Sequence, residues 1–249
     1  PEFSVCSSDL LPFGAKSGNG KTLAVHDACT TRNEKGIQGS IRNIAKKLNY
    51  KIEEPEFTKE KTKCCGYGGL VYYTNKEFSR EITQDRIKDS TKDFLAYCAM
   101  CRDLFVLKGK KTYHILDLIY GSGKEEISEM KVPTLSERRA NRFKLKKELL
   151  DNLWGEKMEI KDEYSDLKIV IGQELRDKIE DELILEGDIK RVIGYAEKTN
   201  DSFYNPENGH ILAWKRFVNI TFWVEYQKVN DSFNIINAYS HRMRSEERR

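Results

Sequence analysis

Two adjacent cysteines followed by a glycine-rich turn, Cys64-Cys65-Gly66-Tyr67-Gly68-Gly69, constrain this chain more than any other stretch. Adjacent cysteines seldom form a disulfide with each other, because the ring would strain the peptide between them. Both thiols are therefore available to bind something on one side of a loop. Two other stretches carry cysteines that can join them, His26-Asp27-Ala28-Cys29 upstream and Cys98-Ala99-Met100-Cys101 downstream.

The composition narrows the classes of protein to consider. The 249 residues suffice for one large domain or two small ones, and with 39% hydrophobic and 33% charged residues they do not have the composition of a disordered chain. A net charge of +3 does not indicate a strongly basic nucleic-acid-binding protein. We recognise no secretory signal and no apolar run of about 20 residues that would predict a transmembrane segment. Six cysteines in such a chain favour metal binding or redox chemistry over a disulfide framework, and we expect a cytoplasmic protein.

Apolar runs and helical periodicities alternate along the first half of the chain, which is typical of an α/β, Rossmann-like layer. We expect an irregular lead-in over residues 1–22, with Cys6 as an ordinary thiol, and a cysteine-rich domain over residues 23–130. The expected elements of this domain are strands at 23–26, 51–57 and 94–97, helices at 37–48, 75–92 and 101–108, and a strand or helix at 112–120.

This topology predicts that the cysteines meet. In Rossmann-like sheets the loops beyond the carboxyl ends of the strands form one crevice. Cys29 and Cys98 each follow an expected strand. In the helix expected at 75–92, the spacing of Phe78 and Ile82 predicts that these two residues mark the inner face.

The pattern changes in the second half of the chain. We expect a helical connector over residues 131–164 and a separate small α+β domain over residues 165–249, with two helices and a three-stranded antiparallel meander. Trp214 and Trp223 are predicted to fill the core of that domain. The connector has a basic stretch over residues 138–147, but acidic neighbours favour a solvated face over a nucleic-acid partner.

The number of cysteines bears on the kind of metal. Cys98 and Cys101 form a CxxC pair, which lets two thiolates face one ion from a single turn. Five thiolates exceed the four ligands of a tetrahedral zinc ion or a cubane cluster. The surplus favours an iron–sulfur cluster of unusual connectivity, or a site with one catalytic cysteine. Zinc and simple thiol redox chemistry stay open as alternatives.

Other residues near the cysteines have predicted roles. The glycines of the central loop, Gly66, Gly68 and Gly69, are expected to let the backbone approach a bulky inorganic group and to offer N–H donors to its sulfides. His26 either hydrogen-bonds such a sulfide or protonates a thiolate product, or is an ordinary strand-end histidine.

The three cysteine stretches together resemble the cysteine-rich CCG domain, which occurs in the B subunit of heterodisulfide reductase and in the iron–sulfur subunit of glycolate oxidase. The resemblance covers about residues 22–120. It implies a non-cubane [4Fe–4S] cluster bound by five cysteines, namely Cys29, Cys64, Cys65, Cys98 and Cys101. In heterodisulfide reductase such clusters deliver electrons directly to a disulfide. This chain has one such unit where that subunit has two.

The resemblance also implies catalytic roles and partners. Cys64, Cys65 and His26 would be the catalytic residues, and the electrons would come from flavin and ferredoxin-type modules. A weaker similarity from residue 97 onward, to large oxidoreductases of anaerobic bacteria, suggests that the chain is the C-terminal fragment of such a protein. The expected function is an iron–sulfur oxidoreductase that acts on a disulfide or another small oxidised substrate. The alternative is an interaction module that zinc or a cluster only braces.

Overall fold

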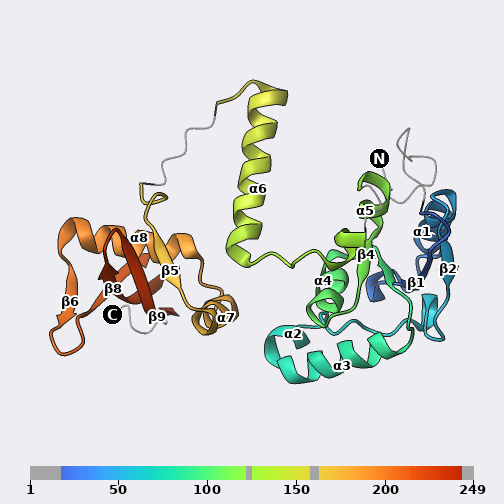
Figure 1. The fold of residues 1–249 in the computed structure, drawn as a ribbon, viewed down its shortest axis with the longest axis horizontal. Coiled ribbons are helices and arrows are strands. Elements are labelled where there is room, and N and C mark those ends of the chain that lie inside the picture. Colours follow the sequence, from blue (N-terminus) through green and yellow to red (C-terminus); the bar gives the residue numbers. More distant parts are fainter. Residues whose placement is uncertain (1–17, 122–124, 158–162, 243–249) are drawn as a thin grey trace. The chain divides into compact units, whose positions relative to one another are not determined.

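The computed structural model describes residues 18–121, 125–157 and 163–242 (Figure 1). Cys6 and most of the expected lead-in lie outside the described residues. The chain divides into two compact units, Pro1–Val132 and Pro133–Arg249.

A four-stranded parallel sheet organises the first unit. Its strands lie in the order β2-β1-β3-β4, and they are β1 (Thr22–His26), β2 (Lys51–Glu53), β3 (Phe94–Ala96) and β4 (Thr112–His114). His26 pairs with Ala96, so β1 and β3 end at the same edge of the sheet. This arrangement confirms the predicted α/β, Rossmann-like class. The expected strand at 51–57 is shorter, because β2 ends at Glu53 and the chain continues as a loop in which Thr58 and Lys59 donate hydrogen bonds to Asp27, the residue after β1.

Helices cover both faces of this sheet, as parallel strands require. They are α1 (Lys35–Lys47), α2 (Val71–Thr74), α3 (Lys76–Lys88), α4 (Ala99–Leu107) and α5 (Ile115–Tyr120). On one face α1 and α5 pack on alternate strand residues such as Leu23 and Val25. On the other face Ala24 and Phe94 pack against Phe105 of α4 and against Cys65. The cysteine loop is therefore part of the second core.

Helix α3 turns a polar face inward, which corrects the sequence-based prediction. Phe78 is 50% exposed, whereas the buried residues of the helix are Ser79, Thr83 and Arg86. Phe78 and Ile82 recur at helical spacing, but so do the polar residues beside them. The polar side chains lie on the inner face because they hydrogen-bond to backbone and side-chain groups of the cysteine site. Apolar side chains in their place would leave those buried groups unsatisfied.

The second unit contains a five-stranded sheet in the order β5-β9-β8-β7-β6. Its strands are β5 (Ile169–Ile171), β6 (Ser202–Asn205), β7 (His210–Phe217), β8 (Ile220–Val229) and β9 (Ser232–Arg242). The expected meander is β7-β8-β9. Strand β6 extends it at one edge, antiparallel to β7, and β5 joins the other edge parallel to β9.

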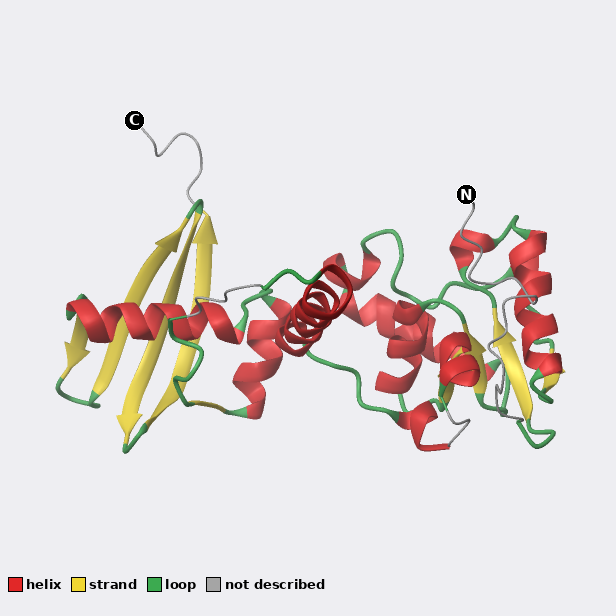
Figure 2. Ribbon diagram, turned by 90° about the horizontal axis from the view of Figure 1, so that it is seen from above, coloured by secondary structure: helices red, strands yellow, loops and turns green. Residues whose placement is uncertain are grey.

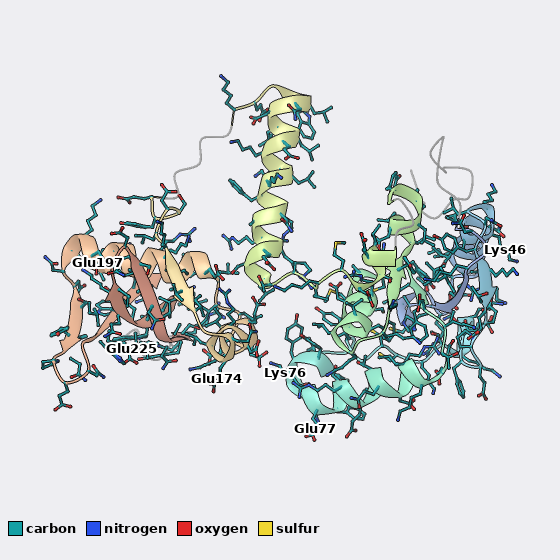
Figure 3. All side chains as sticks on the ribbon, viewed as in Figure 1. Lys46, Lys76, Glu77, Glu174, Glu197 and Glu225 are labelled. Carbon is teal, nitrogen blue, oxygen red and sulfur yellow. The ribbon has the colours of Figure 1, made fainter. Side chains whose placement is uncertain are left out.

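Two helices, α7 (Gln173–Asp181) and α8 (Glu186–Thr199), supply the helical side of this core, and α8 crosses the strands in Figure 2. Tyr226 of β8 donates a hydrogen bond to Glu197 of α8 (2.7 Å), while the neighbouring Glu225 bonds to His210 of β7 (2.7 Å). Glu197 and Glu225 are both labelled in Figure 3.

The two tryptophans expected in this core are only half-buried, which is a second correction. Trp214 pairs with Trp223 across the strands, and Trp223 stacks on Tyr239 with a ring separation of 6.2 Å. They alternate along their strands with core residues such as Ala213 and Val224, so they lie on the opposite face of the sheet.

The helix expected in the connector is α6 (Leu135–Leu149), which continues as a π-helical turn to Trp154. Thr134 and Glu137 form a capping box that fixes where α6 begins. Helix α6 is grouped with the second unit. Among the described helices, none is both long enough and apolar enough to cross a membrane.

Candidate metal centre

Five cysteines of the first unit, all with free thiols, come together from three separate parts of the chain, namely Cys29, Cys64, Cys65, Cys98 and Cys101. Cys29 follows β1, and Cys98 follows β3 at the same edge of the sheet. The loop between β2 and α2 adds Cys64 and Cys65. The Sγ atoms of Cys65 and Cys101 lie 3.2 Å apart. The convergence predicted from the topology is therefore present.

Helix α4 positions the CxxC pair. Cys98 is the residue before the first turn of α4, and Cys101 is buried in that turn. The Cys98 sulfur accepts hydrogen bonds from the Cys101 thiol and from the backbone N–H groups of Cys101 and Met100, which together lower the pKa of Cys98 to about 6. Helix N-termini stabilise thiolates in this way. Cys98 is therefore largely ionised near neutral pH.

The pKa values of Cys64, Cys65 and Cys101 are shifted in opposite directions. Hydrogen bonds from the Cys101 and Cys64 thiols lower the pKa of Cys65, and the same bonds raise the pKa values of Cys64 and Cys101. A set of thiols this close cannot all ionise without a cation to offset the mutual repulsion. The donor set is thus suited to a metal centre that carries substantial positive charge.

The central loop is held from behind by α3. Thr83 donates a hydrogen bond to the carbonyl of Cys65 (2.7 Å), and Ser79 donates one to the carbonyl of Gly66 (2.8 Å). Gly66 has φ +99°, and a Cβ atom there would lie 2.5 Å from the Ser79 carbonyl oxygen. Gly69 also has a positive φ of +64°, whereas Gly68 has open space where a Cβ would stand. In this structure the close approach at Gly66 is to α3.

Backbone N–H groups of the loop point toward sulfur. The N–H of Gly66 donates to Cys64 Sγ (3.3 Å), and the N–H of Tyr67 donates to Cys65. Such donors stabilise negative charge on thiolates and on cluster sulfides. The glycine turn therefore supplies polar groups to the sulfur site as well as a compact path for the chain.

Arg86 fixes the protonation of His26. The imidazole is 1% exposed, and its Nδ1 accepts a hydrogen bond from Arg86 Nε (3.0 Å). Because a guanidinium only donates, Nδ1 carries no proton, and neutral His26 carries its proton on Nε2. Burial lowers the pKa of His26, which favours this neutral form. Arg86 is itself anchored by Asp89 (2.8 Å) and by the carbonyl of Phe57 (2.7 Å).

Two buried side-chain nitrogens among the described residues have no hydrogen-bond partner, Nε2 of His26 and Nη2 of Arg86. Unsatisfied buried donors are rare and point to a missing acceptor. An imidazole nitrogen of His26 and the Sγ atoms of Cys65 and Cys101 all lie within 4.8 Å of one another. A ligand nitrogen must offer a lone pair, which the protonated Nε2 lacks, so His26 fits a donor to sulfur better than a zinc ligand.

Asp27 ties the first cysteine arm to the rest of the unit. Its fully buried carboxylate receives two hydrogen bonds from Arg42 (3.0 and 2.8 Å) and one each from Thr58 (2.6 Å) and Tyr97 (3.0 Å). Burial alone would raise the pKa of Asp27, but the Arg42, Thr58 and backbone Lys59 donors outweigh it and lower the pKa to about 2. This network sets the path of the chain into Cys29.

A known protein-family pattern matches the part of the chain that contains these five cysteines. Residues 23–102 match the cysteine-rich domain family named CCG. The match begins in β1 and ends within α4, so it includes all five converging cysteines. Searches of curated proteins and of solved structures found no significant match. The CCG domain and the cysteine geometry together indicate a bound metal or metal cluster.

Several residues that shape the CCG domain escaped the sequence analysis. Arg86, Ser79 and Thr83 recur at helical spacing on α3, but a polar stripe in the sequence does not distinguish a buried face from a solvated one. Arg42 on α1 had no signal either, because its partner Asp27 lies on a different element. The predicted residues Cys64, Cys65 and His26 lie together as expected, with Cys64 half-buried and the other two buried.

Proposed function

We propose that the CCG domain binds a non-cubane [4Fe–4S] cluster through Cys29, Cys64, Cys65, Cys98 and Cys101, and that the chain transfers electrons to a disulfide or another small oxidised substrate. The observation that carries this proposal is the convergence of five free thiols, two of which lie beside the buried Nε2 donor of His26. A structural zinc ion and a cubane cluster each take four protein ligands, so five converging thiols favour a cluster of another connectivity, whose sulfides also accept N–H donors.

The bound cluster would supply electrons one at a time and a thiophilic metal that can bind a sulfur atom of the substrate. The chain supplies the rest. Cys64 is the half-exposed member of the central pair and lies on the side that a substrate can approach. His26 holds a proton on Nε2 on the side of Cys65 and can donate a hydrogen bond from it to a thiolate or a sulfide. Flavin and ferredoxin-type modules are the proposed electron donors.

Anaerobic reconstitution of the full chain tests the cluster. We expect a brown protein with about four irons and four sulfides per chain. The variant Cys101→Ser should lose most of this iron, because Cys101 lies 3.2 Å from Cys65 inside the buried part of the site. Cys6→Ser is the matched control and should keep the iron, since the sequence predicts that Cys6 is an ordinary thiol outside the three cysteine stretches.

Two outcomes would contradict the proposal. One is a colourless protein that binds one zinc ion per chain with the same thiols. The other is a loaded protein whose reduced cluster is not reoxidised by any small disulfide. The first outcome would favour a zinc-braced interaction module, and the half-exposed aromatic stack of Trp214, Trp223 and Tyr239 would then be its candidate contact surface.

A further inference from the structure

A groove of about 450 Å³ opens directly beside Cys64. Its lining residues are Lys63, Cys64, Phe78, Glu81, Ile82 and Asp85. Four of them come from α3, the helix whose beginning is marked by Lys76 and Glu77 in Figure 3. We propose that this groove binds the organic group of a small disulfide that has an apolar part and no negative charge. The inference rests on the proposed function and names the substrate class for it.

The floor of the groove is apolar. Phe78 and Ile82 lie one turn apart on the face of α3 that the polar stripe of Ser79, Thr83 and Arg86 leaves outside. A phenyl ring that is 50% exposed next to a cysteine gives an organic group a surface to cover. The volume lies in the range of small-molecule sites. An aromatic or aliphatic substituent would therefore be recognised by contact with Phe78 and Ile82.

The charges of the groove disfavour anions. The ammonium of Lys63 lies 3.0 Å from Asp85 and 2.9 Å from Asp89, so its positive charge is already paired. Glu81 adds a further carboxylate to the lining. The lining residues together carry one positive and two negative charges. A disulfide with carboxylate groups would be repelled, while a neutral or cationic one would be accepted.

The position beside Cys64 places the substrate sulfur near the metal centre. In the proposed reaction the sulfur–sulfur bond breaks, each sulfur takes up one electron and one proton, and one disulfide becomes two thiols. A reduced flavin or a reduced ferredoxin-type protein supplies the two electrons and is oxidised. Water supplies the two protons.

Steady-state kinetics on the loaded full chain test the substrate class, with reduced methyl viologen as electron donor. The probes are 4,4′-dithiodipyridine (aromatic, neutral), cystamine (cationic) and 3,3′-dithiodipropionate (anionic). We expect a KM for the anionic probe at least about tenfold above that for the aromatic probe. The variant Glu81→Lys should narrow this difference, since it reverses one charge in the lining.

Phe78→Ala tests the apolar floor. We expect it to raise the KM for 4,4′-dithiodipyridine about tenfold and to leave the iron content unchanged, because the side chain it removes is exposed. Leu107→Ala is the matched control. Leu107 is 57% exposed on α4 and does not line the groove, so its variant should keep the KM of the parent protein.

A binding measurement separates the groove from the chemistry. Calorimetry with bis(4-pyridyl) sulfide, a thioether that cannot be reduced, should show binding to the full chain that Phe78→Ala weakens about tenfold. Unchanged thioether binding and unchanged KM in the double variant Phe78→Ala/Ile82→Ala would overturn the groove and leave the cluster proposal standing. Failure of the cluster proposal has a different signature, the absence of iron from the parent protein. If the variants slow electron uptake from a donor protein and leave the KM for disulfides unchanged, the groove binds protein and the inference is wrong.

Discussion

At the scale of single residues, the pairing of Arg86 with His26 decides what His26 can do. Since Arg86 Nε donates to Nδ1, the proton of His26 lies on Nε2, on the side left for sulfur. Long-range ¹H–¹⁵N NMR of the full chain should show the Nε2–H tautomer. The variant Arg86→Met should let the other tautomer appear. Finding the Nδ1–H form in the parent protein would contradict the assignment.

The same pairing predicts a redox effect. A hydrogen bond to cluster sulfur stabilises the reduced, more negative state and so raises the midpoint potential. With about 1 kcal/mol for one hydrogen bond, His26→Phe should lower the potential of a loaded protein by about 40 mV for one electron. His26→Gln keeps an N–H donor, so its midpoint potential should lie between those of the parent protein and His26→Phe. A purely structural role of His26 would not produce this order.

Asp27 predicts a dependence of stability on pH. The pKa of Asp27 is lowered from 3.8 to about 2 in the folded protein, so its stabilising contribution is present above pH 4 and is lost as the pH falls through 2. The shift corresponds to about 2 kcal/mol. Urea unfolding of the metal-free chain should show Asp27→Asn less stable than the parent at pH 6, with the difference shrinking toward pH 2. A difference in unfolding free energy that stays constant from pH 6 to pH 2 would show that the ionised carboxylate of Asp27 does not stabilise the fold through Arg42.

At the scale of elements, the sequence predicts the order of strands and helices better than it predicts which face a helix buries. The alternation of apolar runs predicts the parallel sheet, and the two strand ends at Cys29 and Cys98 predict the meeting of the cysteines. The inner face of α3 could not be read from hydrophobic spacing. The choice between Phe78 and Thr83 depends on hydrogen bonds to a loop that is distant in sequence, and no local rule contains that information.

The contact between α3 and the cysteine loop predicts unequal roles for two neighbouring glycines. Gly66→Ala would place a Cβ 2.5 Å from the Ser79 carbonyl at φ +99°, so α3 or the loop must shift. We expect a loss of about 3 kcal/mol or more in unfolding free energy, together with loss of bound metal. Gly68→Ala meets open space and should change stability by less than about 0.5 kcal/mol. Equal effects of the two variants, measured by urea unfolding, would contradict this account.

At the scale of the whole molecule, the division after Val132 separates two reporters of folding. All three tryptophans of the sequence, Trp154, Trp214 and Trp223, lie in the second unit, and all five converging cysteines lie in the first. Tryptophan fluorescence therefore follows the second unit, and cluster absorbance follows the first. A ligand stabilises only the cooperative unit that binds it. If each unit folds around its own core, removing the metal should affect the two signals differently.

We therefore expect removal of the metal to leave the fluorescence-detected Tm unchanged within about 2 °C and to lower the Tm of the first unit. Far-UV circular dichroism of the loaded and metal-free chains detects both transitions, and the difference between the two curves isolates the first unit. Cys101→Ser should reproduce the metal-free result at the first unit alone, because Cys101 belongs to that core. A shift of the fluorescence transition on metal removal would mean that the two units unfold together, and that the cluster stabilises the second sheet through the first.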